Sequence, residues 1–186
     1  MELGSGSGDV LAGVCAASAL LPIGIDLSTA AAEHAARRFP ALTWLVANAD
    51  RRLPLLDSSV DVVLSVNGRR NPEECARVLR PRGELVVVVP APDDLLELRQ
   101  AVQGTGASRD RAAGVVSEHG TRFELRERVQ VRVQQRLERA ALLDLLAGTY
   151  RGERHSQAER VAALDTLLVT QASELLFFTP VPRRTA

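Results

Sequence analysis

Lysine is absent from this sequence: all 23 basic residues are arginine, and 23 acidic residues balance them to a formal net charge of zero. Without lysine, the protein has no amine side chain that could act as a nucleophile, a general base or a Schiff-base former. A neutral chain also lacks the overall attraction to phosphate that is typical of a stand-alone nucleic-acid-binding protein. Local arginine clusters remain as candidate contacts with phosphate.

Aromatic residues are scarce, at 3% of the chain against 46% hydrophobic residues, so the core must consist mainly of leucine, valine, isoleucine and alanine. The two cysteines, Cys15 and Cys75, lie far apart in the sequence and predict neither a disulfide framework nor a metal site. There is no secretory signal pattern, and no apolar stretch approaches the ~18 residues that span a bilayer. We therefore expect one cytoplasmic domain covering residues 1–186, without a membrane partner.

Short apolar runs alternate with helical patterns through residue 103, which predicts βαβ units and a mainly parallel sheet. Ser28 has the chemistry of a helix N-cap, and Pro72 stands in the first turn of another helix. Residues 148–160 are expected to form an exposed loop. The expected strands are 22–25, 42–46, 60–66, 85–89, 123–133 and 167–178, and the expected helices are 10–20, 29–39, 71–79, 112–118 and 136–146.

The strongest chemical signal is a glycine loop between a strand end and a helix, with the sequence Glu2-Leu3-Gly4-Ser5-Gly6-Ser7-Gly8-Asp9. Glycines let the backbone take positive φ angles and approach a ligand closely. A dinucleotide fingerprint would be spaced G-x-G-x-x-G, whereas the spacing here is E-x-G-x-G-x-G. This pattern resembles the first motif of the class I S-adenosylmethionine-dependent methyltransferases, in which the loop lies under the methionine part of the cofactor. A nicotinamide-binding site is the alternative.

Three further segments resemble the same family. Asp26 ends the second expected strand, where an acid can hydrogen-bond both ribose hydroxyls of an adenosine; helix capping beside Ser28 is its alternative role. After the third strand, Asn48 or Asp50 resembles the residue that contacts the adenine amino group, and a turn role is the alternative for either. The run 73–85 resembles the structural signature E-x-x-R-V-L-K-P-G-G-x-L, with Arg82 in place of its first glycine.

The resemblance covers residues 2–90 and implies a Rossmann-like α/β fold of class I methyltransferase type, with a mainly parallel seven-stranded sheet flanked by helices. It also implies that S-adenosyl-L-methionine is the cofactor. The residues that it assigns to cofactor binding are Glu2, Gly4, Ser5, Gly6, Gly8, Asp26, Leu27, Asn48, Ala49, Asp50 and Val66.

Segments 65–71 and 89–99 are similar to one branch of the family, the 23S ribosomal RNA guanine-N1 methyltransferases. Members of that branch carry an N-terminal domain with a four-cysteine zinc site, which this chain does not contain. The substrate-side candidates are Asn67, Arg69 and Asn71, in a segment where the branch reads F-A-P-R-N or Y-A-P. Asp94 stands where the branch often has a histidine. None of the candidates is an evident base, so the catalytic residue is left unassigned.

The first strand is expected to be truncated, because Met1 to Leu3 leaves little of a central strand whose normal length is about five or six residues. Either the start lies upstream, or the protein has degenerated, or another segment fills the gap. The alternatives to an RNA methyltransferase are thus a degenerate, non-catalytic module and a small-molecule methyltransferase of the same fold; a homodimer is left open. The histidines His34, His119 and His155 are expected at the surface, and Trp44 and Tyr150 are expected to pack.

Overall fold

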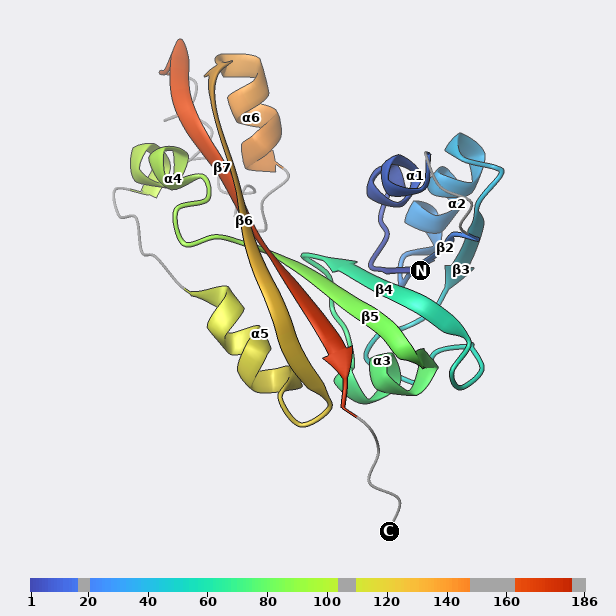
Figure 1. Ribbon diagram of the computed structural model, residues 1–186. Helices are drawn as coiled ribbons and strands as arrows, with labels where there is room; N and C mark the ends of the chain where they lie inside the picture. Colours follow the sequence, from blue (N-terminus) through green and yellow to red (C-terminus); the bar gives the residue numbers. More distant parts are fainter. Residues whose placement is uncertain (17–20, 104–109, 148–162, 182–186) are drawn as a thin grey trace. The chain divides into compact units, whose positions relative to one another are not determined.

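The computed structural model describes residues 1–16, 21–103, 110–147 and 163–181 (Figure 1). In these ranges, strands and helices alternate except where β4 follows β3 and α5 follows α4. None of the described helices has both the length and the hydrophobicity needed to cross a membrane. The elements are β1 (Glu2–Leu3), α1 (Asp9–Cys15), β2 (Ile23–Asp26), α2 (Thr29–Arg38), β3 (Thr43–Val46), β4 (Val60–Val66), α3 (Pro72–Val78), β5 (Leu79–Pro90), α4 (Leu96–Gln103), α5 (Arg111–His119), β6 (Phe123–Glu138), α6 (Arg139–Ala147) and β7 (Thr166–Pro180).

The strands form one seven-stranded sheet in the order β3-β2-β1-β4-β5-β7-β6. Strands β3, β2, β1, β4 and β5 pair in parallel, and the short β1 pairs with β2 on one side and with β4 on the other. Strands β6 and β7 run antiparallel, since Val181 N–H donates to Arg122 O at one end of the pair and Arg139 N–H donates to Asp165 O at the other. The predicted fold, a mainly parallel seven-stranded sheet with flanking helices, is confirmed.

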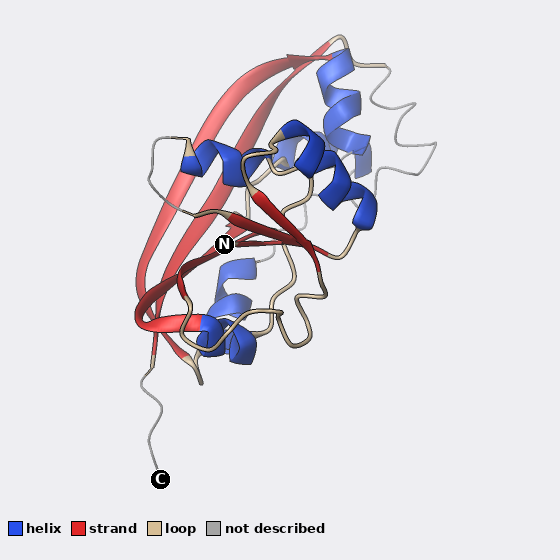
Figure 2. Cartoon of the chain, turned by 90° about the vertical axis from the view of Figure 1, so that its right-hand side faces the viewer, coloured by secondary structure: helices blue, strands red, loops and turns tan. Residues whose placement is uncertain are grey.

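Contacts divide the chain into two compact units. Unit 1 comprises Met1–Val89, Ala112–Val129 and Leu175–Ala186, and unit 2 comprises Pro90–Arg111 and Gln130–Glu174. In unit 1, helices α1 and α2 lie on one face of the sheet and α3 and α5 on the other (Figures 1 and 2). The prediction of a single domain over residues 1–186 stays a prediction.

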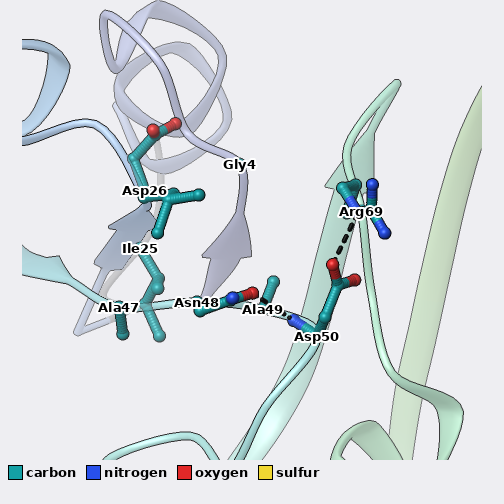
Figure 3. Close-up of a pocket in the computed structure, with 9 residues that line it drawn as sticks. Gly4, Ile25, Asp26, Ala47, Asn48, Ala49, Asp50 and Arg69 are labelled. Carbon is teal, nitrogen blue, oxygen red and sulfur yellow. Dashed lines mark hydrogen bonds and ion pairs between the residues drawn. The ribbon is translucent and has the colours of Figure 1, made fainter.

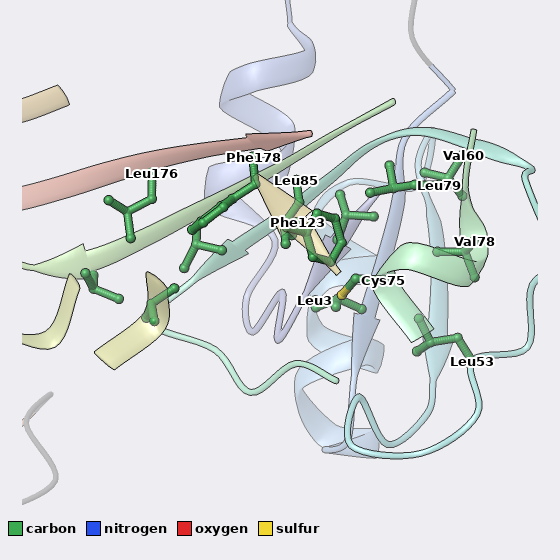
Figure 4. Close-up of a cluster of buried hydrophobic side chains, with 14 of the residues drawn as sticks. Leu3, Leu53, Val60, Cys75, Val78, Leu79, Leu85, Phe123, Leu176 and Phe178 are labelled. Carbon is green, nitrogen blue, oxygen red and sulfur yellow. The ribbon is translucent and has the colours of Figure 1, made fainter. Parts of the chain in front are cut away.

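Each unit has its own buried cluster of aliphatic side chains, as the composition indicates. Figure 4 shows the core of unit 1, in which two phenylalanines join leucines, valines and Cys75. The buried members in unit 1 are Leu3, Ile25, Leu53, Val60, Val63, Cys75, Val78, Leu79, Leu85, Val87, Val89, Ala112, Val115, Phe123, Leu176 and Phe178. The buried members in unit 2 are Leu98, Val102, Leu142, Leu146 and Val169.

Two helices begin where side-chain chemistry predicts. The Ser28 hydroxyl caps α2 by accepting a hydrogen bond from Ala31 N at 3.2 Å. Asn71 Oδ1 caps α3 by accepting from Glu73 N at 3.0 Å, and Pro72 occupies the first turn, where a missing N–H costs nothing. These caps fix the start of each helix immediately after the loop at the end of the preceding strand.

Other boundaries differ from the prediction. The sixth strand continues to Glu138, so Arg136 belongs to β6 and α6 begins only at Arg139. Strand β5 is also longer than the predicted 85–89, and α1 ends at Cys15, before residues that lie outside the described ranges. Val129, Val131 and Val133 alternate with polar residues, and Leu137 lies on the same face of the strand. Leu137 packs against the core of unit 2, and this contact favours an extended backbone up to the end of β6. The predicted loop 148–160 lies outside the described residues.

The segment between β3 and β4 is fixed by one buried ion pair. Arg77, whose side chain is 8% exposed, donates Nε and Nη2 hydrogen bonds to the Glu74 carboxylate at 2.8 and 2.7 Å. The same guanidinium donates to Leu53 O at 3.1 Å and to Leu55 O and Asp57 Oδ1 at 2.8 and 2.7 Å. Glu74 Oε2 also accepts from Leu53 N at 2.8 Å. The E-x-x-R signature thus holds the chain that leads into β4.

Candidate functional site

The glycine loop follows the carboxyl end of β1, an interior strand of the sheet. Gly4, Gly6 and Gly8 have φ angles of 70°, 51° and 83°, a left-handed conformation that residues with a side chain rarely adopt. Gly4 N–H and Ser5 N–H both donate to Ile25 O, at 2.8 and 3.1 Å. The loop is therefore tied to the end of β2 before it enters α1.

Asp26 connects this loop to the start of α2. Its Oδ2 accepts a hydrogen bond from Gly6 N–H at 2.8 Å, and its Oδ1 accepts from Ser28 N–H at 2.8 Å. Each carboxylate oxygen has a further lone pair for another donor. The predicted meeting of the glycine loop and Asp26 at one end of the sheet is thus present in the structure.

A cavity of about 280 Å³ opens beside the glycine loop (Figure 3). Its walls come from the ends of β1, β2 and β3 and from the loop after β4, which is the edge where open parallel sheets bind ligands. Its volume is near the lower end of the range for small-molecule sites, about 300–1,000 Å³. The lining residues are Gly4, Ile25, Asp26, Leu27, Ala47, Asn48, Ala49, Asp50 and Arg69.

Both residues predicted to contact an adenine line this cavity. Asn48 Oδ1 accepts from Asp50 N–H at 2.9 Å, so Asn48 also shapes the turn. Asp50 Oδ2 forms an ion pair with Arg69 Nε at 2.6 Å (Figure 3), and Asp50 O accepts from Asn71 Nδ2 at 3.3 Å. These contacts tie the loop after β3 to the predicted substrate-side segment.

Glu2, in β1, and Ser5, in the glycine loop, do not line the cavity. Glu2 is 2% exposed, and burial raises the pKa of its carboxyl to about 7, against a smaller lowering effect of the Leu11 N–H. Glu2 Oε2 and Ser5 Oγ are buried and have no hydrogen-bond partner in the part of the chain that the structure describes. Buried polar atoms of this kind are uncommon in folded proteins, and each is a candidate contact for a bound polar group.

The remaining predicted residues occupy the surroundings of the cavity. Gly8 packs against the ring of Trp44 so closely that a Cβ at this position would lie only 2.3 Å from Trp44 Cη2. Val66 ends β4, and Asn67, with φ 53°, follows it in a left-handed conformation. Asn71 caps α3 and contacts the loop after β3. The roles of these residues toward a ligand stay predictions.

Sequence reasoning missed Ile25 and Ala47, which line the cavity. They are small or apolar strand-end residues, and only their positions next to Asp26 and Asn48 could have indicated them. The prediction of a surface position for His119 is wrong: His119 is 0% exposed, because α5 packs it against Phe123 and Phe178.

His34 is exposed and Trp44 packs against glycines, as predicted. His155 and Tyr150 lie outside the described residues. Residues 117–122 are mostly polar, which is why His119 was expected at the surface. A helix with a polar sequence can still bury one of its faces.

Comparison with known proteins gives a consistent picture. Residues 1–83 match a family model described as a methyltransferase domain. The chain is 34% identical over 172 residues to the 23S rRNA (guanine(748)-N(1))-methyltransferase of Streptomyces fradiae, with 88% of this chain and 60% of that protein covered. It therefore spans about three-fifths of the length of that relative.

Solved structures resemble the chain in fold. One is a SAM-dependent methyltransferase from Thiobacillus denitrificans in complex with S-adenosyl-L-homocysteine, with a TM-score of 0.56, 17% identity and coverage of 97% of this chain and 84% of that one. Another is a SAM-dependent methyltransferase from Geobacter sulfurreducens in complex with the same compound, with a TM-score of 0.58, 16% identity and coverage of 97% and 83%. At these identities the likeness shows the fold alone.

Proposed function

Because the chain belongs to the class I S-adenosylmethionine-dependent methyltransferases, we propose that its cavity binds the adenosine part of that cofactor and that the protein methylates a guanine base of ribosomal RNA. The observation that carries this proposal is the convergence of the glycine loop, Asp26 and residues 48–50 on one cavity. Three segments from three separate parts of the chain meet there, at the edge of the sheet where ligands bind.

The side chains in the cavity have the chemistry that an adenosine requires. Asp26 is placed to accept hydrogen bonds from the ribose hydroxyls while it holds Gly6 and Ser28. Asn48 and Asp50 offer an amide and a carboxylate toward an adenine edge, and Ile25, Leu27 and Ala47 supply apolar walls. The unpartnered Ser5 Oγ and Glu2 Oε2, near the glycine backbone, suit the polar amino-acid end of the cofactor. The residues present thus fit S-adenosylmethionine.

S-adenosylmethionine, when bound, supplies a methyl group on a sulfonium, which transfers by in-line displacement. The protein therefore has to align donor and acceptor and to exclude water. A guanine N1 acceptor must leave its base stack and lose its proton before it is methylated. Asn67, Arg69 and Asn71 are the substrate-side candidates, and since none carries a carboxylate or imidazole, we assign none of them the role of base.

The acceptor is proposed from the likeness to the Streptomyces fradiae enzyme. A small-molecule acceptor is the second candidate, and the zero net charge of the chain favours it, because RNA-binding surfaces are usually basic. The substrate-side segment 67–71, which departs from the F-A-P-R-N pattern, favours a third candidate, a module that has lost catalysis. Binding and activity measurements separate these candidates.

Calorimetry with S-adenosylmethionine tests the cofactor site. We expect the unaltered protein to bind it and Asp26→Ala to raise the dissociation constant at least tenfold, since each hydrogen bond to a charged acceptor contributes about 1.5–3 kcal/mol. Asp61→Ala, which removes an exposed carboxylate that pairs with Arg80 on the sheet, should leave affinity unchanged. An unchanged constant in a folded Asp26→Ala protein would remove Asp26 from the site.

Transfer of a radiolabelled methyl group to ribosomal RNA tests the acceptor. We expect label in 23S RNA, at a position where methylation of guanine N1 blocks base pairing and stops reverse transcription. Cofactor binding without transfer to RNA, but with transfer to small molecules, would support the second candidate. Binding without transfer to either would support the non-catalytic module.

A further inference from the structure

We infer that Arg70 and His119 form a buried hydrogen-bonded pair that sets the shape of the loop on the acceptor side of the site, which makes His119 a positioning residue for methyl transfer. The inference rests on the proposed function for its catalytic consequence and on the structure for the pair itself. His119 is at the end of α5, and Arg70 is in the loop between β4 and α3.

The contacts of His119 specify one protonation state. Its Nε2 lies 3.2 Å from Arg70 Nε, an atom that can only donate, so Nε2 must accept. Its Nδ1 lies 2.9 Å from Val115 O, an atom that can only accept, so Nδ1 must carry the proton. Two independent partners therefore require the neutral Nδ1–H tautomer. Phe123 and Phe178, with ring centroids 6.0 and 5.7 Å away, hold the ring in place.

Arg70 connects His119 to the loop between β4 and α3. Its side chain is 9% exposed, and its Nη1 donates to Gly68 O at 3.0 Å while Nε engages His119. A planar guanidinium fixes the relative positions of its donors, so the carbonyl of Gly68 is held at a set distance from the imidazole. Glu118 Oε2 lies 3.9 Å from Nη2 and balances the charge.

The backbone of Gly68 packs against the cofactor loop, so a small displacement of Gly68 would also move that loop. A Cβ at Gly68 would lie 2.7 Å from Leu3 O, and a Cβ at Gly4 would lie 3.3 Å from Gly68 Cα, so the two backbones are in close contact. The preceding Asn67 has a left-handed φ of 53° and donates its N–H to Val88 O at 3.0 Å. The neighbouring Arg69 lines the cavity. The buried pair thus fixes the loop that contacts the cofactor loop and carries the substrate-side candidates.

Protonation of His119 would break this arrangement. An N–H at Nε2 would face the Arg70 N–H, and two cations would share a buried space. Burial lowers the pKa of His119, and the Arg70 guanidinium lowers it further, against the opposite effects of the Val115 carbonyl and Glu118. Cys75, which is near Arg70 as Glu118 is, has its pKa raised to about 12 by burial and stays a neutral thiol. His119 is therefore neutral at pH 7.

Nuclear magnetic resonance tests the pair without any assay of activity. We expect the ring ¹⁵N shifts of His119 to show a neutral Nδ1–H tautomer from about pH 6 to 8. Arg70→Met should change the backbone amide shifts of residues 67–71, and Arg122→Met, which removes an exposed partner of Glu73, should leave them in place. An Nε2–H tautomer, or unchanged shifts in Arg70→Met, would overturn the inference even if the protein proves to be inactive.

Kinetics test the positioning role. His119→Phe keeps the ring and its volume but removes the acceptor, and we expect the rate of methyl transfer to fall at least tenfold while the dissociation constant of S-adenosylmethionine changes less than threefold. Leu79→Val is the control, because it loosens the same core and changes neither Arg70 nor the two phenylalanines that pack against His119. Equal rates in His119→Phe and the unaltered protein would overturn the positioning role. Failure of the unaltered protein to bind the cofactor would instead contradict the proposed function.

Discussion

At the scale of single residues, Trp44 explains why two glycines are required. A Cβ at Gly24 would lie 2.2 Å from Trp44 Cζ3, and one at Gly8 would lie 2.3 Å from Cη2. The indole cannot move away freely, since its Nε1 donates to Phe39 O at 3.1 Å. Gly8, the third glycine of the loop, therefore makes room for an indole, whereas Gly4 lines the cavity.

Gly24→Ala should destabilise the protein by about 1–3 kcal/mol, because the added methyl group overpacks the space against the Trp44 ring. Gly13→Ala in α1 is the matched control: a Cβ there meets nothing within 4 Å, and alanine is about 1 kcal/mol more favourable than glycine inside a helix. Urea unfolding of both variants measures the difference. Equal stability of Gly24→Ala and the unaltered protein would show that the ring yields without cost.

At the scale of elements, the sequence predicts strands best where an apolar run is nearly continuous, and it predicts helices best where the start carries a capping residue or a first-turn proline. Strand 60–66 is found at its predicted bounds, α2 begins after the predicted cap Ser28, and α3 begins at Pro72, the proline predicted in its first turn. The boundary between β6 and α6 was missed because an arginine-rich surface suits a helix and an exposed strand equally. Packing of Leu137, which sequence alone does not show, decides between them.

The site residues also divide into those that the sequence could indicate and those that it could not. Polar residues at strand ends were predictable, because parallel strands bring their carboxyl ends to one edge. The apolar walls Ile25 and Ala47 carry no chemical signal, and the burial of His119 depends on which face of α5 meets the sheet.

Arg77 fixes the segment between β3 and β4, and Arg77→Met should cost about 3–5 kcal/mol, because it leaves Glu74 and two backbone carbonyls without their buried partner. Arg80→Met is the control, since the exposed Arg80–Asp61 pair should contribute less than about 1 kcal/mol. Thermal and urea unfolding provide both values. Similar losses in the two variants would contradict a special role for the buried pair.

The same pair has a pH signature. The hydrogen bond from Arg77 holds the pKa of Glu74 below its usual value. The ionised Glu74 carboxylate therefore stabilises the folded state above about pH 4.5, and this stabilisation is lost as the pH falls through the lower pKa of the folded state. Arg77→Met should therefore lose less stability than the unaltered protein on acidification.

At the scale of the whole molecule, two buried groups make stability depend on pH in opposite directions. The folded state raises the pKa of Glu2 to about 7, so this group makes the protein less stable as pH rises from about 4.5 to 7. The folded state lowers the pKa of His119, so this group makes the protein less stable as pH falls below about 6.5. Their effects partly cancel in the range between.

Glu2→Gln should separate the two effects. The variant cannot ionise at this position, so its stability relative to the unaltered protein should rise between about pH 4.5 and 7, by at most about 3 kcal/mol. Glu33→Gln, at an exposed position of α2, should show no such rise. Urea unfolding at about pH 4, 6 and 8, which lie below, within and above this range, measures the difference. A difference that does not vary with pH would mean that Glu2 ionises normally.

The position of Trp44 gives the protein a built-in optical reporter. It is the single tryptophan, and the chain has only one tyrosine besides. Its indole rests against the last glycine of the loop and against β2, next to the strand end that carries Asp26. Tryptophan emission from the unlabelled protein therefore originates at one known point beside the glycine loop, and any displacement of that loop changes the surroundings of the fluorophore directly.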